Sequence, residues 1–205
     1  VYKRQGVNNN FWNDKENHMK YAIWLGKELG YKIKDDWYKI NIKDFRYNYG
    51  WGLIQKHNCS PLMFLNCVFP DTEWLPWKLG TQTPQYFWND EENHIKYVHW
   101  LGKEIGYKNK DDWYQITGKT IDNNYGAGLL MKYNRSPQKL LNFVYPDTEW
   151  LPWKFGQCGN GFWKNKENHA KYANWIMNEY NFTTMEDWYK TNRIVLQDNH
   201  GGGLL

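Results

Sequence analysis

The segment Pro-Asp-Thr-Glu-Trp-Leu-Pro-Trp-Lys occurs twice in the chain without any difference, at residues 70–78 and at residues 146–154. The proline that opens each copy interrupts a helix, and a Leu-Pro step between two tryptophans favours an extended backbone. Tryptophan rings on such a segment can bury a large apolar area against a neighbouring element. We therefore interpret both copies as linkers that join repeated units.

The repeat extends well beyond these linkers. Phe-Trp pairs begin at residues 11, 87 and 162, at spacings of 76 and 75 residues, and a glycine-rich stretch begins in the same register at residues 50, 126 and 201. The sequence thus predicts a preceding linker at 1–10, a first repeat at 11–86, a second at 87–161 and a third, cut within the repeat, at 162–205.

The composition indicates a folded protein that stays outside the membrane. Of the 205 residues, 41% are hydrophobic and 14 are tryptophans, which is enough apolar surface to build real cores. No apolar run approaches the roughly 20 residues of a membrane span, and no signal peptide opens the chain. We expect an intracellular location, in cytoplasm or nucleus, or a place in a virion, and no secretion.

Each repeat begins with a predicted long helix. Asp14 is suited to the N-cap, Glu16 favours the positive end of the helix dipole, and Gly30 is suited to the C-cap. Apolar residues such as Tyr21 and Leu25 recur between them at helical spacing. The pattern predicts a helix of about four turns.

An acidic pair followed by tryptophan and tyrosine comes next, at residues 35–38, 111–114 and 186–189. Paired acids can serve catalysis or bind Mg²⁺. They can also cap a short helical turn whose aromatic rings lie in the core. We favour capping, because nothing nearby supplies a general acid or further ligands.

Two short helices should complete the repeat. One begins at the glycine-rich stretch, since glycines are costly inside a helix. The other begins at Ser60-Pro61 and at Ser136-Pro137, where serine is suited to the N-cap and proline to the first helical position. The predicted fold class is therefore all-α, with tandem three-helix repeats of helix-turn-helix type, about 76 residues long, joined by the Trp-Leu-Pro-Trp linkers.

The glycine-rich stretch has two interpretations. A helix that begins at glycine exposes backbone N–H groups and the positive end of its dipole, which can bind phosphate. No Gly-Lys-Ser/Thr follows, so the stretch is not a P-loop. The glycines can equally allow a tight turn and close helix packing.

The repeats differ most just before this stretch, at residues 43–47, 119–123 and 194–198. Variation there is typical of a modular binder in which each repeat contacts a different part of its target. Neutral drift on a solvated loop gives the same pattern.

No catalytic, metal or cofactor motif is evident, and no small-molecule substrate is indicated. His18, His94 and His169 lack a second ligand three or four residues away, so we expect them to cap helices or to form surface hydrogen bonds. The three cysteines, Cys59, Cys67 and Cys158, are odd in number, and their positions do not follow the repeat. We predict neither a disulfide framework nor a zinc site, and no enzyme.

The pattern from Trp-x-x-x-x-Asn through Asp-Trp-Tyr, Tyr-Gly-x-Gly-Leu-Leu and Ser-Pro to Trp-Leu-Pro-Trp-Lys-Phe resembles tandem repeats of giant DNA viruses, fungi and algae. It is distantly similar to the homing-endonuclease-associated repeat, a helical DNA-binding module. That second resemblance implies DNA binding at the turn. The chain has no matching nuclease motif, so cleavage is not implied.

Two functions are therefore expected, and the first is favoured. The chain is a DNA-binding array, or it is a structural array that binds other protein subunits, as a net charge of only +4 suggests. For DNA binding, glycine N–H groups would approach phosphates, and the neighbouring cations and asparagines would contact phosphates or base edges. The candidate residues are Lys43, Arg46, Asn48, Gly50, Gly52, Lys56, Lys119, Asn123, Asn124, Gly126, Gly128, Lys132 and Arg193.

Overall fold

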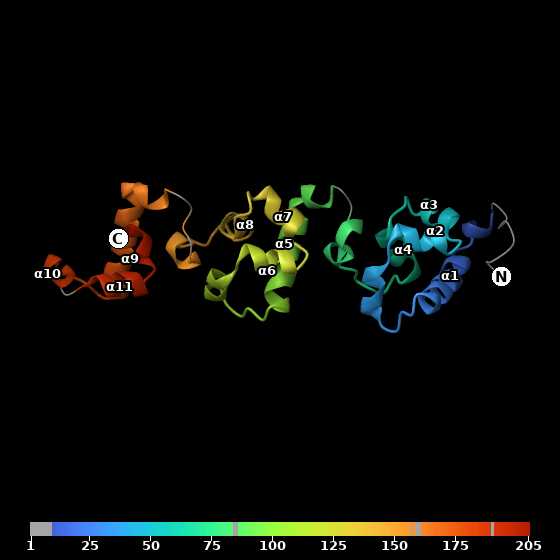
Figure 1. The fold of residues 1–205 in the computed structure, drawn as a ribbon, viewed down its shortest axis with the longest axis horizontal. Helices are drawn as coiled ribbons and strands as arrows, with labels where there is room; N and C mark the ends of the chain where they lie inside the picture. Colours follow the sequence, from blue (N-terminus) through green and yellow to red (C-terminus); the bar gives the residue numbers. More distant parts are fainter. Residues whose placement is uncertain (1–9, 84–85, 157, 159–160, 190) are drawn as a thin grey trace. The chain divides into compact units, whose positions relative to one another are not determined.

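The computed structural model describes residues 10–83, 86–156, 158, 161–189 and 191–205. All regular structure in these residues is helical (Figure 1), which confirms the predicted all-α class. The predicted linker at 1–10 lies outside the described residues apart from Asn10, and parts of the stretches that precede the second and third Phe-Trp pairs lie outside them too.

The chain forms two compact units, Val1–Asn93 and His94–Leu205, and the boundary between them falls inside a helix. The first unit contains η1 (Phe11–Asn13), α1 (Lys15–Glu28), η2 (Lys34–Lys39), α2 (Ile42–Tyr47), α3 (Trp51–Lys56), α4 (Pro61–Val68), η3 (Pro76–Gln82) and η4 (Phe87–Asn89). Its core is formed mainly by α1, α3 and α4 together with Phe45.

The helix α5 (Glu91–Glu104) crosses the boundary. The second unit continues with η5 (Asp111–Gln115), α6 (Gly118–Asn123), α7 (Ala127–Lys132), α8 (Pro137–Val144), η6 (Pro152–Phe155), η7 (Phe162–Lys164), α9 (Lys166–Glu179), α10 (Met185–Trp188), α11 (Arg193–Asp198) and η8 (Gly201–Leu204). Helices α1, α5 and α9 each have 14 residues, α2, α6 and α11 each have six, and α4 and α8 each have eight.

The helix boundaries follow the predicted capping residues. The Asp14 side chain accepts a hydrogen bond from the Glu16 amide at 2.9 Å, and the Ser60 hydroxyl accepts one from the Met63 amide at 3.3 Å. Gly30 adopts a left-handed φ of 73° just after α1, where the helix has to stop. The local sequence thus sets where the helices start and end.

The acidic pairs cap short helical turns, as the sequence predicted. One carboxylate oxygen of Asp112 accepts the backbone N–H groups of Lys108 at 2.6 Å and Asn109 at 3.0 Å. These bonds stabilise the ionised form and hold the pKa of Asp112 below its usual range. Asp36 accepts the equivalent pair of N–H groups, and so does Asp187.

One helix was missed by the sequence analysis. The segment at 43–47 belongs to α2, so the stretch from α1 to α4 contains four α-helices and the predicted three-helix unit is wrong in this respect. Asn41 and Asp44 form a reciprocal cap, in which the Asp44 carboxylate accepts the Asn41 amide at 2.8 Å and the Asn41 side chain accepts the Lys43 amide at 2.9 Å. The cap explains why a polar, variable segment is helical.

The tryptophans of the repeated segment are buried, as predicted. Trp74 and Trp150 are each 6% exposed, and they contact tyrosines of the preceding acidic turns, with the ring centroids of Trp150 and Tyr114 5.4 Å apart. Trp77 and Trp153 instead pack against the aromatic residues that follow. The ring centroid of Trp153 lies 5.4 Å from that of Tyr172 on α9. Each segment therefore contacts both the helices before it and those after it.

No helix among the described residues combines the length and the apolar character needed to cross a membrane.

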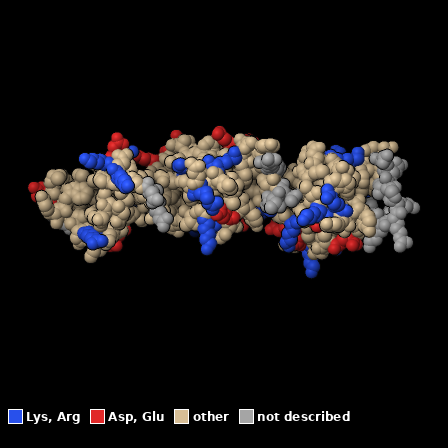
Figure 2. Space-filling model, turned by 45° about the horizontal axis from the view of Figure 1, so that its top comes forward, with Lys and Arg blue, Asp and Glu red and all other residues tan. Residues whose placement is uncertain are grey.

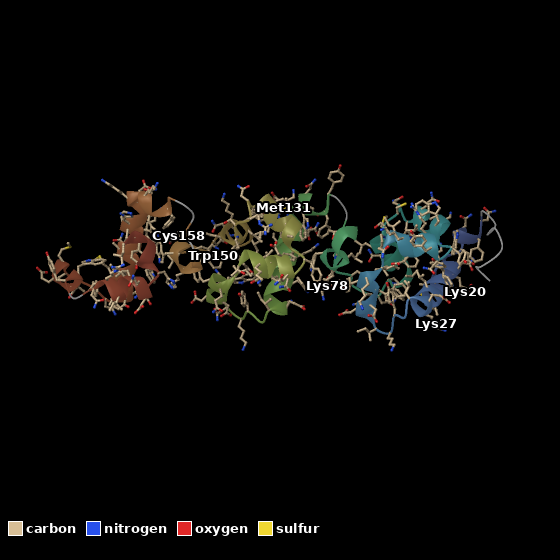
Figure 3. The ribbon with its side chains drawn as sticks, viewed as in Figure 1. Lys20, Lys27, Lys78, Met131, Trp150 and Cys158 are labelled. Carbon is tan, nitrogen blue, oxygen red and sulfur yellow. The ribbon has the colours of Figure 1, made fainter. Side chains whose placement is uncertain are left out.

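Replacing Trp150, labelled in Figure 3 on the segment between α8 and η6, with alanine should lower the free energy of unfolding by about 3–5 kcal/mol, because a large ring is removed from a packed site. Tyr189→Ala is the control, since Tyr189 is 91% exposed and its loss should change stability by less than about 0.5 kcal/mol. Urea unfolding followed by circular dichroism measures both variants. A loss below about 1 kcal/mol for Trp150→Ala would show that the ring does not support the fold.

Candidate nucleic-acid interface and a histidine cluster

The glycine turn connects α2 with α3 and α6 with α7. Its left-handed position is occupied by Tyr49 and Tyr125, with φ of 62° and 67°, and not by a glycine. Gly50 and Gly126 follow with ordinary negative φ values of −97° and −94°. Backbone conformation therefore does not explain why these two positions are glycine.

The glycines make room for a buried tyrosine hydroxyl. A Cβ atom at Gly50 would lie 2.1 Å from the hydroxyl oxygen of Tyr21 on α1. The same contact would be 2.2 Å between Gly126 and Tyr97, and 2.4 Å between Gly201 and Tyr172. A side chain cannot occupy such a position without moving the tyrosine. Close packing, one of the two interpretations of the sequence, thus accounts for these glycines.

The tyrosine hydroxyl also ties the turn to the long helix. In the first unit, Tyr21 donates a hydrogen bond to the backbone carbonyl of Asn48 at 2.9 Å. Tyr97 donates to Asn124 at 2.9 Å and Tyr172 donates to Asn199 at 3.0 Å. Burial raises the pKa of Tyr97 above its usual range, so the hydroxyl stays protonated and remains a donor.

Four of the predicted site residues serve the fold of the turn. The amide of Gly50 donates to the Phe45 carbonyl at 2.8 Å, and the Gly126 amide donates to the Ile121 carbonyl at 2.9 Å. These two amides therefore do not offer the free N–H groups that we expected for phosphate. The side-chain amide of Asn48 donates to the Asp44 carbonyl, and that of Asn124 donates to the Thr120 carbonyl, both at 2.8 Å.

The other nine predicted site residues are exposed. They are Lys43, Arg46, Gly52 and Lys56 in the first unit, and Lys119, Asn123, Gly128, Lys132 and Arg193 in the second. Three exposed tyrosines that the sequence analysis did not select lie among them. Tyr47 is 75% exposed, and Tyr49 and Tyr125 are each 49% exposed. Their position in a turn rich in polar residues could have predicted from the sequence that these tyrosines are exposed.

Acidic groups near the turn are engaged locally. The Asp44 carboxylate accepts the backbone and side-chain N–H groups of Asn41, at 2.8 and 2.7 Å. Asp122 forms an ion pair with Arg135 at 2.5 Å. Meanwhile the Arg46 guanidinium lies over the Trp51 ring, 4.4 Å from its centroid.

We define the turn surface as Lys43, Arg46, Tyr47, Tyr49, Gly52 and Lys56, and its second-unit counterpart as Lys119, Asn123, Tyr125, Gly128 and Lys132.

Charge is not gathered into one basic stripe on the face shown in Figure 2. Lysine, arginine and acidic side chains are interspersed over that face. On that face, attraction for a polyanion would therefore come from local groups of cations.

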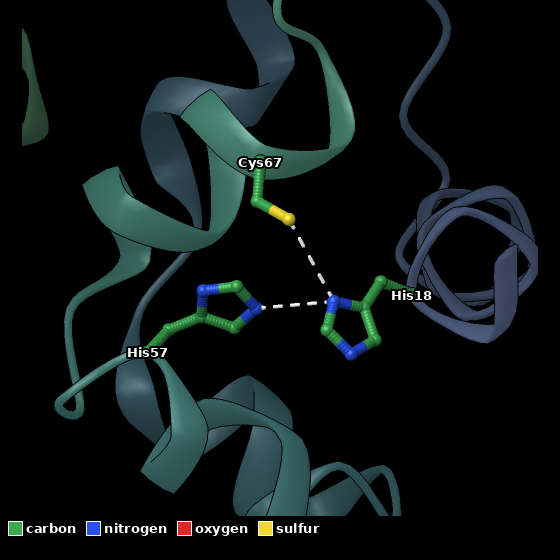
Figure 4. A group of neighbouring side chains, drawn as sticks. All are labelled: His18, His57 and Cys67. Atoms are coloured by element: carbon green, nitrogen blue, oxygen red, sulfur yellow. Dashed lines mark hydrogen bonds between the residues drawn. The ribbon is translucent and has the colours of Figure 1, made fainter. Parts of the chain in front are cut away.

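A second group of polar side chains surrounds His18. This histidine is 6% exposed, and its Nε2 lies 2.9 Å from the Trp12 carbonyl. Its Nδ1 lies 3.3 Å from Nε2 of His57 and 3.7 Å from Sγ of Cys67 (Figure 4). The prediction that the histidines cap helices or bond at the surface is wrong for His18, and also for His94, which is 5% exposed.

No second ligand stands three or four residues from a histidine in the sequence, and for this reason we predicted no metal site. The structure instead brings His57 and Cys67 to His18 from 39 and 49 residues away, and the three ligand atoms lie within 4.8 Å of one another. Burial, with a smaller contribution from His18, lowers the pKa of His57 below its usual range.

Comparison of the chain with protein families, with curated proteins and with solved structures gives no match in any of the three.

Gly50→Ala should lower the free energy of unfolding by about 2–4 kcal/mol, because the new methyl group overlaps the Tyr21 hydroxyl and displaces its hydrogen bond to the Asn48 carbonyl. Gly52→Ala is the matched control from the same turn. Its Cβ would lie 3.3 Å from the Trp12 ring, and the gain in helix propensity of up to about 1 kcal/mol offsets this contact. If chemical denaturation gave equal stabilities for the two variants, the packing account of Gly50 would be wrong.

Proposed function

We propose that the chain is a non-enzymatic array of helical repeats that binds DNA through the turn surface of each repeat. The array part of the proposal is supported by helices of equal length in equal order, at 76-residue spacing between α1 and α5 and between α4 and α8. It is further supported by the tyrosine–glycine contact, which occurs three times. The Trp-Leu-Pro-Trp segments would act as linkers, with one ring on each neighbouring repeat.

One observation carries the DNA part of the proposal. Exposed cations flank exposed tyrosines around the turn, while Asp44 is engaged in capping α2 and Asp122 is paired with Arg135. Lysine and arginine neutralise phosphates and release counterions, which supplies essentially all of the non-specific affinity of proteins for DNA. Tyrosine hydroxyls bond to phosphate and sugar, and tyrosine rings stack on bases. The distant resemblance to homing-endonuclease-associated repeats favours the same function.

The short helices behind the turn limit how the array would read DNA. Helices α3 and α7 have six residues each, which is a length of about 9 Å. A helix of this length offers few side chains to base edges in the major groove. We therefore propose that phosphate contacts dominate and that sequence preference is weak.

A protein-interaction array is the second candidate. It is favoured by exposed apolar side chains on the same elements, since Met131 on α7 (labelled in Figure 3) is 67% exposed and Ile194 on α11 is 64% exposed. Such side chains are more typical of a protein interface than of a phosphate-binding surface. In this case the array would be a structural component that binds other protein subunits.

Binding of duplex DNA by the whole chain should weaken steeply with salt, because each neutralised phosphate contributes about −0.9 to the slope of log K against log salt. Changing Lys56 and Lys132 together to glutamate should lower the affinity about tenfold or more and make the slope shallower by about 0.9 for each lysine. Fluorescence anisotropy at several salt concentrations measures both quantities.

The control changes Lys27 and Lys103 to glutamate. These exposed lysines lie in the last turns of α1 and α5 and do not belong to the turn surface, and the change in net charge is the same. Equal weakening by both pairs would show that the turn surface is not the binding site. If the unaltered chain failed to bind duplex DNA at about 50 mM salt, the DNA proposal would be wrong and the protein-interaction array would take its place.

A further inference from the structure

We propose that Nδ1 of His18, Nε2 of His57 and Sγ of Cys67 bind one Zn²⁺ ion, or a transition-metal ion of similar preference, in the first unit. The three atoms come from three elements. His18 lies on α1, His57 caps the end of α3, and Cys67 lies on α4. A metal ion held by all three would fasten these helices to one another.

Two of the three distances between the ligand atoms suit a tetrahedral ion, and the third pair, His57 Nε2 and Cys67 Sγ, lies within 4.8 Å. Zinc bonds of about 2.0–2.1 Å to nitrogen and 2.3 Å to sulfur place two nitrogens about 3.3 Å apart and a nitrogen and a sulfur about 3.6 Å apart. The corresponding distances from His18 Nδ1 are 3.3 Å to His57 Nε2 and 3.7 Å to Cys67 Sγ. All three atoms point toward one another in Figure 4.

His18 is also held in the orientation that metal-binding histidines adopt. The Trp12 carbonyl can only accept a hydrogen bond, so Nε2 of His18 carries the proton that it donates at 2.9 Å. The lone pair of the neutral ring is then on Nδ1, which faces the other two ligands. A carbonyl partner on the second ring nitrogen is the usual support of a metal-bound histidine.

The ligand set selects the class of ion. Two imidazoles and one thiolate favour Zn²⁺, Co²⁺ and Cu⁺ over Mg²⁺ and Ca²⁺, which prefer oxygen ligands. Binding would replace the thiol proton of Cys67, and this proton would be released to solvent. Three protein ligands leave a fourth position for water.

In the second unit, the residues equivalent to His57 and Cys67 are not metal ligands. His94 is buried like His18, but its Nδ1 lies 2.8 Å from the Tyr133 hydroxyl, and Phe143 packs on its ring with centroids 5.6 Å apart. Tyr133 and Phe143 occupy the positions equivalent to His57 and Cys67. The Tyr133 hydroxyl thus forms a hydrogen bond with the histidine in one unit, while the other unit places two side chains there that can bind a metal ion.

The test uses Co²⁺ as a spectroscopic probe on the whole, reduced chain from which metal has been removed. Titration should produce a thiolate-to-cobalt charge-transfer band that saturates at one Co²⁺ per chain. Addition of Zn²⁺ should abolish the band, because Zn²⁺ binds more tightly than Co²⁺. Saturating Zn²⁺ should also raise the unfolding temperature, since the ion binds only the folded chain.

The matched variant carries His57→Tyr and Cys67→Phe. The second unit has tyrosine and phenylalanine at the equivalent positions, Tyr133 and Phe143, so both side chains are compatible with this fold. The variant should keep its helical circular dichroism and lose more than about 100-fold in Co²⁺ affinity, beyond the 10–100-fold typical of losing a supporting residue. Cys67→Ser should also remove the band, whereas Cys59→Ser and Cys158→Ser should leave it unchanged.

Absence of the band in the unaltered chain at a large excess of Co²⁺ would overturn the proposal. So would a band of equal intensity in the folded double variant, or one that disappears with Cys59→Ser. The outcome does not depend on DNA binding, because no nucleic acid is present in the experiment.

Discussion

The hydroxyl group of a buried tyrosine determines how close the long helix and the glycine turn can approach. Tyr21, Tyr97 and Tyr172 are each at most 1% exposed, and each hydroxyl lies where a Cβ atom of the turn glycine would be. The hydroxyl donates a hydrogen bond to a partly buried carbonyl of the turn, so both groups have a partner. The contact therefore fixes the position of α2 and α3 on α1, and of α6 and α7 on α5.

The turns of this chain share the geometry of their inner side, whereas the residues on their outer side differ from one turn to the next. The inner side of the turn is fixed by tyrosine, glycine and the carbonyls, and the outer side carries exposed residues such as Arg46, Tyr49 and Lys119. The surroundings of the buried histidines show the same combination of a shared position and different neighbours. His18 and His94 are both buried, but His18 lies beside His57 and His94 lies beside Tyr133. Side chains of different chemical character can thus occupy equivalent positions while the buried core stays the same.

Local signals in the sequence predicted the helix starts and the capping role of the acids, because serine, proline and aspartate act within three or four residues of themselves. The helix α2 was missed, since its cap of Asn41 and Asp44 lies in a segment where the repeats differ and no proline marks its start. The hydrogen bond from the Gly50 amide to the Phe45 carbonyl and the contact between His18 and Cys67 both depend on how separate elements pack together. Such contacts are set by packing and are not encoded in local spacing.

A double-mutant cycle on Tyr97 and Gly126 tests the tyrosine–glycine contact most directly. Tyr97→Phe in the unaltered chain should cost about 1–3 kcal/mol of unfolding free energy, because the Asn124 carbonyl loses its buried donor. In a Gly126→Ala background the methyl group has already displaced the hydroxyl, so the same change should cost less than about 0.5 kcal/mol. Equal costs in the two backgrounds, within about 0.5 kcal/mol, would show that the tyrosine and the glycine act independently and would contradict this account of the turn.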